Sequence, residues 1–180
     1  MNLLYLGGKK WKSDTMINSV LVRPNTKELL ESKGVQVSIL EYTDNDTHES
    51  IRERAIQSNH DFIFGYSYGA EVASSLSAKG IIMLDLLSSV PPRLINEYFE
   101  RDYRNANKNI SGYFPYDLYH TIKCPVLSII TGEGTKSNKL DNVVNVCYSY
   151  LPNSTHLVMI EEGRYQLVDM IFKFMEKHYV

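Results

Sequence analysis

A serine flanked by glycines is the residue of this chain best suited to covalent chemistry. Ser67 lies at the centre of a Gly-x-Ser-x-Gly pattern over residues 65–69, between an apolar run and a helical pattern of small residues. Between a strand and a helix, this pattern holds the serine in a strained turn and projects its hydroxyl above the sheet. The two glycines leave room for the strand and the helix to approach each other. The pattern therefore predicts a nucleophilic serine.

A serine hydroxyl is a weak nucleophile at neutral pH and needs a base within hydrogen-bonding distance. His156 follows the last predicted strand, in a loop of small residues, and topology places it at the same edge of the sheet as Ser67. His120, at the end of a long insertion, is a minor candidate. The other histidines lie in a polar helix, at the opposite end of a strand and in the C-terminal tail: His48, His60 and His178.

The base needs an acid that orients its ring, and three carboxylates are candidates. Asp85 ends the strand that follows the nucleophile. Glu133 and Asp141 follow the next strand along the chain. The residues alone leave the choice among them open.

Acyl chemistry also needs donors for a developing oxyanion, usually two backbone N–H groups. One is expected from Tyr68, directly after the nucleophile. The other is expected from the loop after the first strand, near Gly8 or Lys9. The alternative for that loop is a plain connection between a strand and a helix.

Strands and helices alternate along the chain. Apolar runs predict strands at 3–6, 35–40, 61–65, 81–85, 125–131 and 143–148. Helices are predicted from an N-cap at Asn25 to Gly34, over 46–58, over 68–78 with Gly80 closing it, and in an amphipathic C-terminal segment around 167–175. Such strands predict an α/β fold with a mostly parallel sheet of about six strands and helices on both faces. Ligands of such sheets bind beyond the carboxyl ends of the strands.

Residues 88–122 interrupt this alternation. The segment opens with two prolines and is dense in aromatic side chains, among them Tyr98, Phe99, Tyr113 and Phe114. An insertion at the edge of the sheet that carries Ser67 predicts a lid whose aromatic residues wall an acyl pocket. The alternative is a helix packed on the core with a tyrosine-rich outer face.

Length and composition predict a single domain over residues 1–180. The net charge of −2 argues against a nucleic-acid binder, and no apolar run has membrane-spanning length. Cys124 and Cys147 lie in apolar runs without metal spacing, which predicts reduced core cysteines in a cytoplasmic protein. The apolar start of the chain is too short for a signal peptide.

Three segments together resemble the α/β-hydrolase superfamily, and more narrowly the thioesterase domains that release products from nonribosomal peptide and polyketide synthases. They are residues 65–69 (GYSYG), 81–85 (IIMLD) and 154–160 (STHLVMI). The resemblance implies that Ser67 is the nucleophile, Asp85 the acid and His156 the base. The chain begins at Met1 without a carrier-domain remnant, and from this we expect a free-standing enzyme.

The resemblance implies a serine hydrolase acting on an acyl thioester linked to coenzyme A or to an acyl or peptidyl carrier protein. No metal or diffusible cofactor is required for this chemistry. Two alternatives remain open. One is a small carboxylesterase acting on oxygen esters. The other is a non-catalytic protein of the same fold that binds an acyl chain or a partner.

Overall fold

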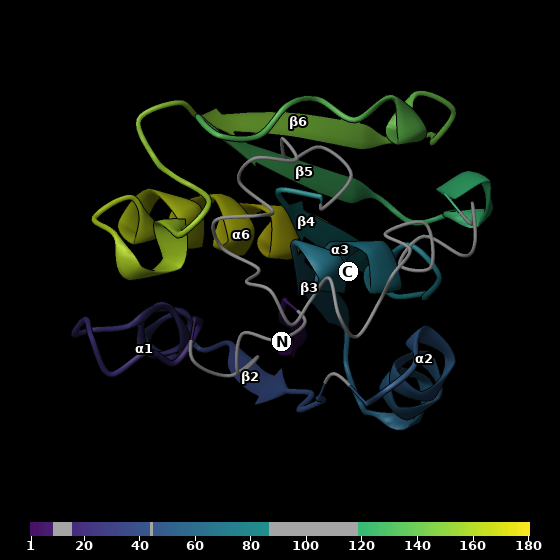
Figure 1. Cartoon of the computed structure of the whole chain (residues 1–180), viewed down its shortest axis with the longest axis horizontal. Coiled ribbons are helices and arrows are strands. Elements are labelled where there is room, and N and C mark those ends of the chain that lie inside the picture. Colours follow the sequence, from purple (N-terminus) through teal and green to yellow (C-terminus); the bar gives the residue numbers. More distant parts are fainter. Residues whose placement is uncertain (9–15, 44, 87–118) are drawn as a thin grey trace.

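The predicted parallel sheet is present in the computed structural model, which describes residues 1–8, 16–43, 45–86 and 119–180. Its strands are β1 (Asn2–Leu6), β2 (Gln36–Ile39), β3 (Phe62–Tyr66), β4 (Gly80–Leu84), β5 (Val126–Thr131) and β6 (Val146–Leu151). They lie side by side in the order β2-β1-β3-β4-β5-β6, and each pair is parallel (Figure 1). The predicted fold class is therefore confirmed.

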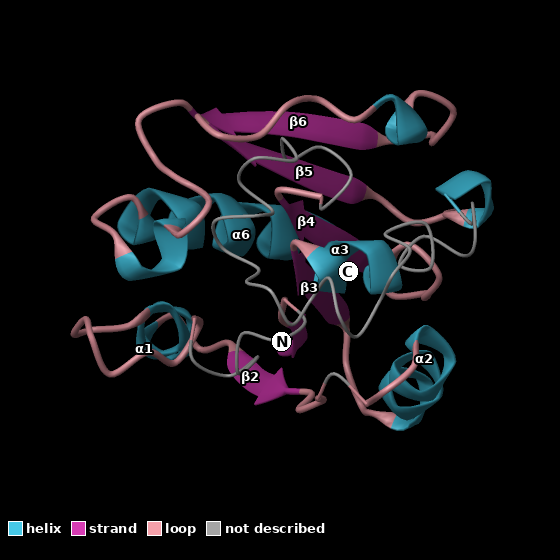
Figure 2. Ribbon diagram, in the orientation of Figure 1, coloured by secondary structure: helices cyan, strands magenta, loops and turns pink. Residues whose placement is uncertain are grey.

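Helices cover both faces of the sheet (Figures 1 and 2). On one face lie α1 (Thr26–Ser32) and α6 (Arg164–His178), and on the other lie α2 (His48–Gln57) and α3 (Tyr68–Ala73). Short 3-10 helices lie in the loops: η3 (Tyr119–Thr121), η4 (Asn138–Leu140) and η5 (Val158–Ile160). A buried apolar cluster fills the space between the sheet and each helical layer.

The helix starts follow from local hydrogen bonds. Asn25 caps α1 by accepting from the backbone N–H of Glu28, and the Glu28 carboxylate accepts from the backbone N–H of Asn25. Thr47 and Ser50 form the equivalent pair at the start of α2. These reciprocal bonds satisfy backbone donors that a helix leaves without partners. The N-cap predicted at Asn25 is confirmed.

Helix α3 ends five residues earlier than the sequence pattern predicts. Ser74 donates its hydroxyl to the Glu71 carbonyl at 2.6 Å, and Ser75 donates to the Val72 carbonyl at 2.8 Å. Serine hydroxyls that bond to nearby carbonyls compete with the continuation of a helix. Gly80 does not close the helix but begins β4, where a side chain would overlap with the ring of Phe174.

Strand β6 is displaced toward the C-terminus from the predicted 143–148. The preceding residues form a turn in which Asn145 has a positive φ of 67°. The strand is also an edge of the sheet, and this corrects the prediction for the cysteines. Cys147 is exposed on β6 and Cys124 is half-buried, although both are free thiols as predicted.

The register of the sheet brings the carboxyl ends of four strands together. Leu6 of β1 pairs with Gly65 of β3, and Tyr66 pairs with Leu84 of β4. Leu84 in turn pairs with Ile129 of β5. Because the strands are parallel, their carboxyl ends meet at one edge. The segments that follow β1, β3, β4 and β5 therefore start side by side.

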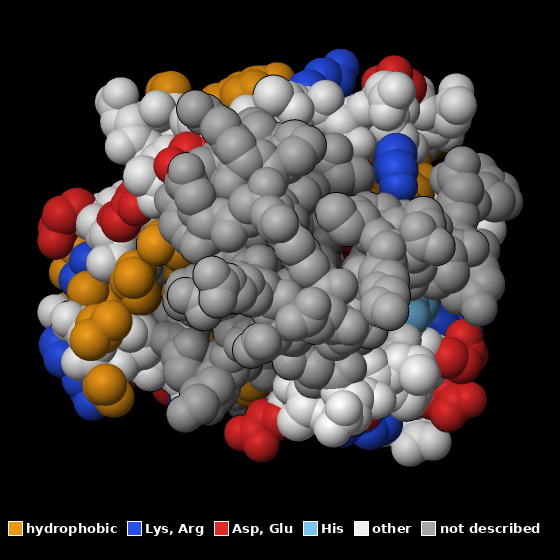
Figure 3. Space-filling view, viewed as in Figure 1, with side chains coloured by type: hydrophobic (Ala, Val, Ile, Leu, Met, Phe, Trp, Pro, Cys, Tyr) orange, Lys and Arg blue, Asp and Glu red, His pale blue; other side chains and the backbone are white. Residues whose placement is uncertain are grey.

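Acidic and basic side chains are interspersed around the described rim of the face in Figure 3. None of the helices in the described ranges has the length and apolar character needed to cross a bilayer. Of the predicted insertion 88–122, the structure describes residues 119–122, where Tyr119 and Ile122 are buried in the core. The proposed lid residues Tyr98, Phe99, Tyr113 and Phe114 lie outside the described residues.

Candidate active site

Ser67 occupies a strained turn between β3 and α3. Its φ of 55° and ψ of −114° lie in a region that residues other than glycine rarely adopt. The backbone N–H of Ser67 donates to the Leu84 carbonyl at 2.9 Å, which extends the pairing of β3 with β4 past the end of the strand. The side chain is buried, and its hydroxyl has no hydrogen-bond partner among the described residues. Among the described residues, the turn thus holds the serine through its backbone.

Close packing explains both glycines of the Gly-x-Ser-x-Gly pattern. A Cβ on Gly65 would overlap with the backbone of Gly69 and Ala70 in α3, so this glycine allows the strand and helix to approach each other, as predicted. A Cβ on Gly69 would instead overlap with the carbonyl oxygen of Leu6. The absence of a side chain at Gly69 therefore allows the start of α3 to pack against the end of β1.

Asp85 and His156 form a hydrogen-bonded pair at this edge. His156 Nδ1 lies 2.9 Å from Asp85 Oδ2, and the two side chains are 1% and 0% exposed. Thr131 donates its backbone N–H to Asp85 Oδ1 at 2.9 Å and its hydroxyl to Oδ2 at 2.6 Å. A carboxylate buried in this way needs such donors to replace its lost hydration. With Asp85 accepting, Nδ1 carries the ring proton and Nε2 is the nitrogen that can act as a base.

The backbone of Asp85 is also fixed. Asp85 has a positive φ of 43°, a conformation that aspartate adopts more readily than most residues. Its N–H donates to the Ile129 carbonyl at 3.0 Å. A Cβ on Gly134 would overlap with Asp85 Oδ1, so the loop after β5 packs directly against the carboxylate.

Glu133, the alternative acid, contacts the histidine at a different point. Its Oε2 accepts a hydrogen bond from the backbone N–H of His156 at 2.7 Å. Asp141 is exposed and caps the C-terminal end of η4. Of the three predicted carboxylates, Asp85 is therefore the one whose bond to the imidazole the structure records.

Tyr66 connects His156 to the turn that carries Ser67. It directly precedes Ser67 and donates its hydroxyl to the His156 carbonyl at 2.7 Å. Its ring lies against the imidazole, with 4.8 Å between centroids and 32° between planes. These contacts place His156 beside the turn that carries Ser67.

The remaining histidines differ in their distance from this edge. His60 pairs with Ser58 at the amino end of β3, as predicted, with 2.9 Å between Oγ and Nδ1. His48 begins α2, but its ring meets the ring of Tyr68 edge-on at 6.3 Å, so it lies closer to the turn than its polar helix suggests. The side chain of His120 is not among those described.

The predicted oxyanion donors lie at the same edge. Tyr68 is the first residue of α3, so its N–H belongs to the helix N-terminus. Gly8 is buried just past β1, and the neighbouring Gly7 lies against Gly69. Lys9 lies outside the described residues.

Sequence reasoning missed three residues that support this site. Thr131 bonds twice to Asp85, Tyr66 supports His156, and Tyr42 donates its hydroxyl to the carbonyl of Gly7. Burial raises the pKa of Tyr42 well above its ordinary value, so the hydroxyl remains a donor. Of the three, only Tyr66 could have been suspected from the sequence, because it directly precedes Ser67. The other two are recognised only once the strands are paired.

Removing the Tyr42 hydroxyl tests the support of the loop after β1. Tyr42→Phe leaves the Gly7 carbonyl buried without its donor, which is expected to lower the free energy of unfolding by about 1–3 kcal/mol. Urea denaturation measures this change. Tyr150→Phe, at a side chain that is 53% exposed, is the control and should change stability little. Equal stability of the two variants would contradict the assignment.

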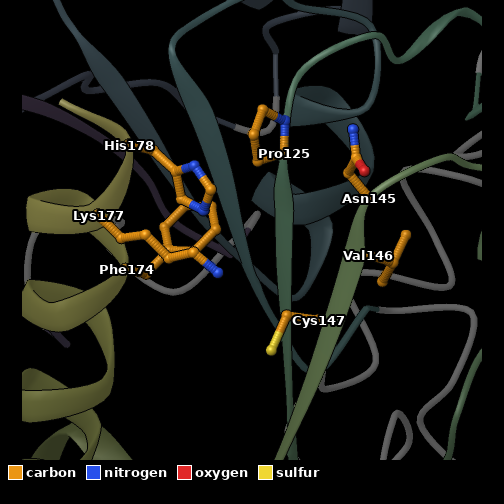
Figure 4. Close-up of a pocket in the computed structure, with 7 residues that line it drawn as sticks. All are labelled: Pro125, Asn145, Val146, Cys147, Phe174, Lys177 and His178. Atoms are coloured by element: carbon orange, nitrogen blue, oxygen red, sulfur yellow. The ribbon is translucent and has the colours of Figure 1, made fainter. Parts of the chain in front are cut away.

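Cavities bounded by described residues lie at the opposite edge of the sheet. One of about 350 Å³ is formed at the amino ends of β5 and β6 by residues that include Cys147, Phe174 and His178 (Figure 4). Another of about 410 Å³ lies near Arg52 and His60, at the amino end of β3. Neither adjoins Asp85 and His156, so neither corresponds to the predicted acyl pocket.

Comparison with solved structures identifies the fold. The chain is similar to BpoC from Mycobacterium tuberculosis H37Rv, with 12% identity, a TM-score of 0.67 and coverage of 98% of this chain and 92% of BpoC. It is similar to MenH from S. aureus, with 10% identity, a TM-score of 0.65 and coverage of 100% and 95%. It is also similar to a thermophilic esterase from Thermogutta terrifontis, with 12% identity, a TM-score of 0.63 and coverage of 100% and 91%.

No protein-family model and no curated protein matches the sequence. The assignment therefore depends on the strand order, the strained serine turn and the structural similarity over the whole chain. At the level of fold, the resemblance that the sequence motifs suggest is confirmed. This chain has the α/β-hydrolase fold.

Proposed function

We propose that this protein is a serine hydrolase that cleaves acyl thioesters through a covalent acyl-enzyme. The observation that carries the proposal is the 2.9 Å hydrogen bond between Asp85 and His156 beside the Ser67 turn. The acid comes from the strand after the nucleophile strand, which is the arrangement that the resemblance to thioesterase domains implies. This supports a thioester substrate over the alternatives.

In the proposed reaction, Ser67 Oγ attacks the thioester carbonyl while His156 Nε2 takes the hydroxyl proton. Asp85 stabilises the resulting imidazolium at Nδ1. The N–H groups of Tyr68 and Gly8 stabilise the oxyanion. Collapse of the tetrahedral intermediate breaks the carbon–sulfur bond, and the thiol leaves with the proton from His156. Water, deprotonated by His156, then releases the carboxylic acid and regenerates the serine.

Two measurements test this proposal. Intact-mass analysis after treatment with a fluorophosphonate is expected to show one adduct, which peptide mapping assigns to Ser67. Turnover is then compared between an acyl-N-acetylcysteamine thioester and the oxygen ester of the same acyl group, each divided by its uncatalysed hydrolysis rate. The thioester is expected to be favoured.

Each alternative predicts a different outcome. A carboxylesterase would favour the oxygen ester by a wide margin after this correction. A non-catalytic acyl-binding protein would form no adduct, and Ser67→Ala would leave its affinity for an acyl ligand unchanged. A carrier-protein partner is tested by comparing one acyl group on coenzyme A and on a phosphopantetheinylated carrier protein. A higher kcat/KM on the carrier is expected if the carrier protein is recognised.

A further inference from the structure

We infer that Tyr66 and Glu133 are positioning residues that hold the backbone of His156 from both sides. This inference depends on the proposed function, because it concerns how the base of that site is held. The N–H of His156 donates to Glu133 Oε2 at 2.7 Å, and its carbonyl accepts from the Tyr66 hydroxyl, also at 2.7 Å. Both peptide groups of one residue are thus bound by side chains from distant parts of the chain.

The position of His156 in the chain explains the need for such support. It lies in the connection between β6 and η5, outside any helix or strand. No strand pairing or helical hydrogen bond therefore fixes its main chain. A catalytic base must hold its position closely, because a shift of about 1 Å can lower a rate by about 100-fold. Side chains have to supply the rigidity that regular structure supplies elsewhere.

The two side chains come from elements that are themselves fixed. Tyr66 is the last residue of β3 and is 3% exposed. Glu133 follows β5 by two residues, and its backbone N–H donates to the hydroxyl of Thr131, the residue that also binds Asp85. The histidine loop is therefore tied to the strand that carries the nucleophile and to the strand beside the acid.

Tyr66 also restricts the ring of the base. The hydrogen bond that Nδ1 donates to Asp85 fixes one side of the imidazole, and a contact on the ring face restricts its tilt about that bond. The Tyr66 ring covers one face of the imidazole at a centroid distance of 4.8 Å. The ring contact restricts the tilt of the imidazole. The hydrogen bond from the Tyr66 hydroxyl restricts the position of the His156 backbone.

Conservative and disruptive substitutions separate these contributions. Tyr66→Phe keeps the ring and removes the hydroxyl, whereas Tyr66→Leu removes both. Glu133→Gln keeps an oxygen that can accept from the His156 N–H, whereas Glu133→Ala removes it. The rate of fluorophosphonate labelling is expected to fall about 10-fold in Tyr66→Phe and in Glu133→Ala, and about 100-fold in Tyr66→Leu. Glu133→Gln is expected to retain a rate within about threefold of wild type.

Combination with His156→Ala distinguishes positioning from general stability. If the two residues act through the base, Tyr66→Phe and Glu133→Ala have no further effect on residual labelling once the imidazole is absent. Glu162→Gln is the matched control, since this carboxylate is 92% exposed. Folding of every variant is checked by its thermal transition.

The possible outcomes separate this inference from the proposed function. Efficient labelling of wild type with unchanged rates in Tyr66→Phe and Glu133→Ala would overturn the inference and leave the proposed function intact. Equal losses with and without His156 would also overturn it, because a structural defect lowers both rates. Absence of an adduct on folded wild type would overturn both.

Discussion

Ser67→Ala is expected to lower hydrolysis of the preferred substrate by about 10⁴- to 10⁶-fold, as removal of a triad nucleophile does in serine hydrolases. The substitution removes the atom that forms the acyl-enzyme. It leaves the glycine contacts of the turn and the Asp85–His156 pair in place. Single-turnover kinetics and intact mass after fluorophosphonate treatment measure the loss. Activity within tenfold of wild type would exclude Ser67 as the nucleophile.

Ser67→Gly is the companion variant that separates chemistry from backbone strain. Alanine inherits the φ of 55°, whereas glycine adopts positive φ without a steric penalty. A non-glycine residue in this conformation carries strain of about 1–3 kcal/mol, which glycine relieves. Glycine also makes the unfolded chain more flexible, and this lowers part of the gain in stability. Ser67→Gly is therefore expected to be more stable than Ser67→Ala by about 1 kcal/mol and equally inactive. Urea denaturation of the two variants tests this difference.

Asp85→Asn is expected to lower kcat/KM by about 10⁴-fold, the effect of the same change in a serine protease triad. An amide can donate to Nδ1 of His156, and this favours the tautomer with its proton on Nε2. That tautomer cannot take the proton of Ser67. The amide oxygen can still accept from the Thr131 N–H, so the variant is expected to fold.

Glu133→Gln is the matched control for this prediction. It removes the same charge from a carboxylate whose recorded bond is to the backbone N–H of His156. Parallel kcat/KM measurements should rank Asp85→Asn far below Glu133→Gln. The reverse ranking would make Glu133 the acid and require the loop after β5 to rearrange.

Much of the fold was predictable because its signals are local. Uninterrupted apolar runs predict buried parallel strands, and Asn25 with Glu28 marks the start of a helix by chemistry confined to one turn. The positions of Ser67 and His156 at one edge follow from strand order, which the alternation of elements implies. The limits of β6 and α3 were predicted less well, since a turn at Asn145 and two serine hydroxyls decide them.

The residues of the candidate site could be named from the sequence, but the hydrogen bonds between them could not. The positions of Asp85 and Glu133 after their strands predict that both lie near the sheet edge that carries Ser67. It does not show which carboxylate meets the ring of His156 and which meets its backbone. That distinction depends on the path of two loops packed against each other, where Gly134 lies against Asp85. The roles of Tyr66 and Thr131 depend on the same three-dimensional information.

The long sequence separations within the site have a consequence for protein synthesis. Asp85 and His156 are 71 residues apart, and Tyr66 and His156 are 90 apart. A nascent chain therefore contains Ser67 well before His156 leaves the ribosome. Strand β6 lies between them in the sequence and must join the sheet before His156 can lie beside the Ser67 turn. An unfinished chain thus carries Ser67 without its proposed base, and the proposed activity requires the C-terminal part of the chain to be in place.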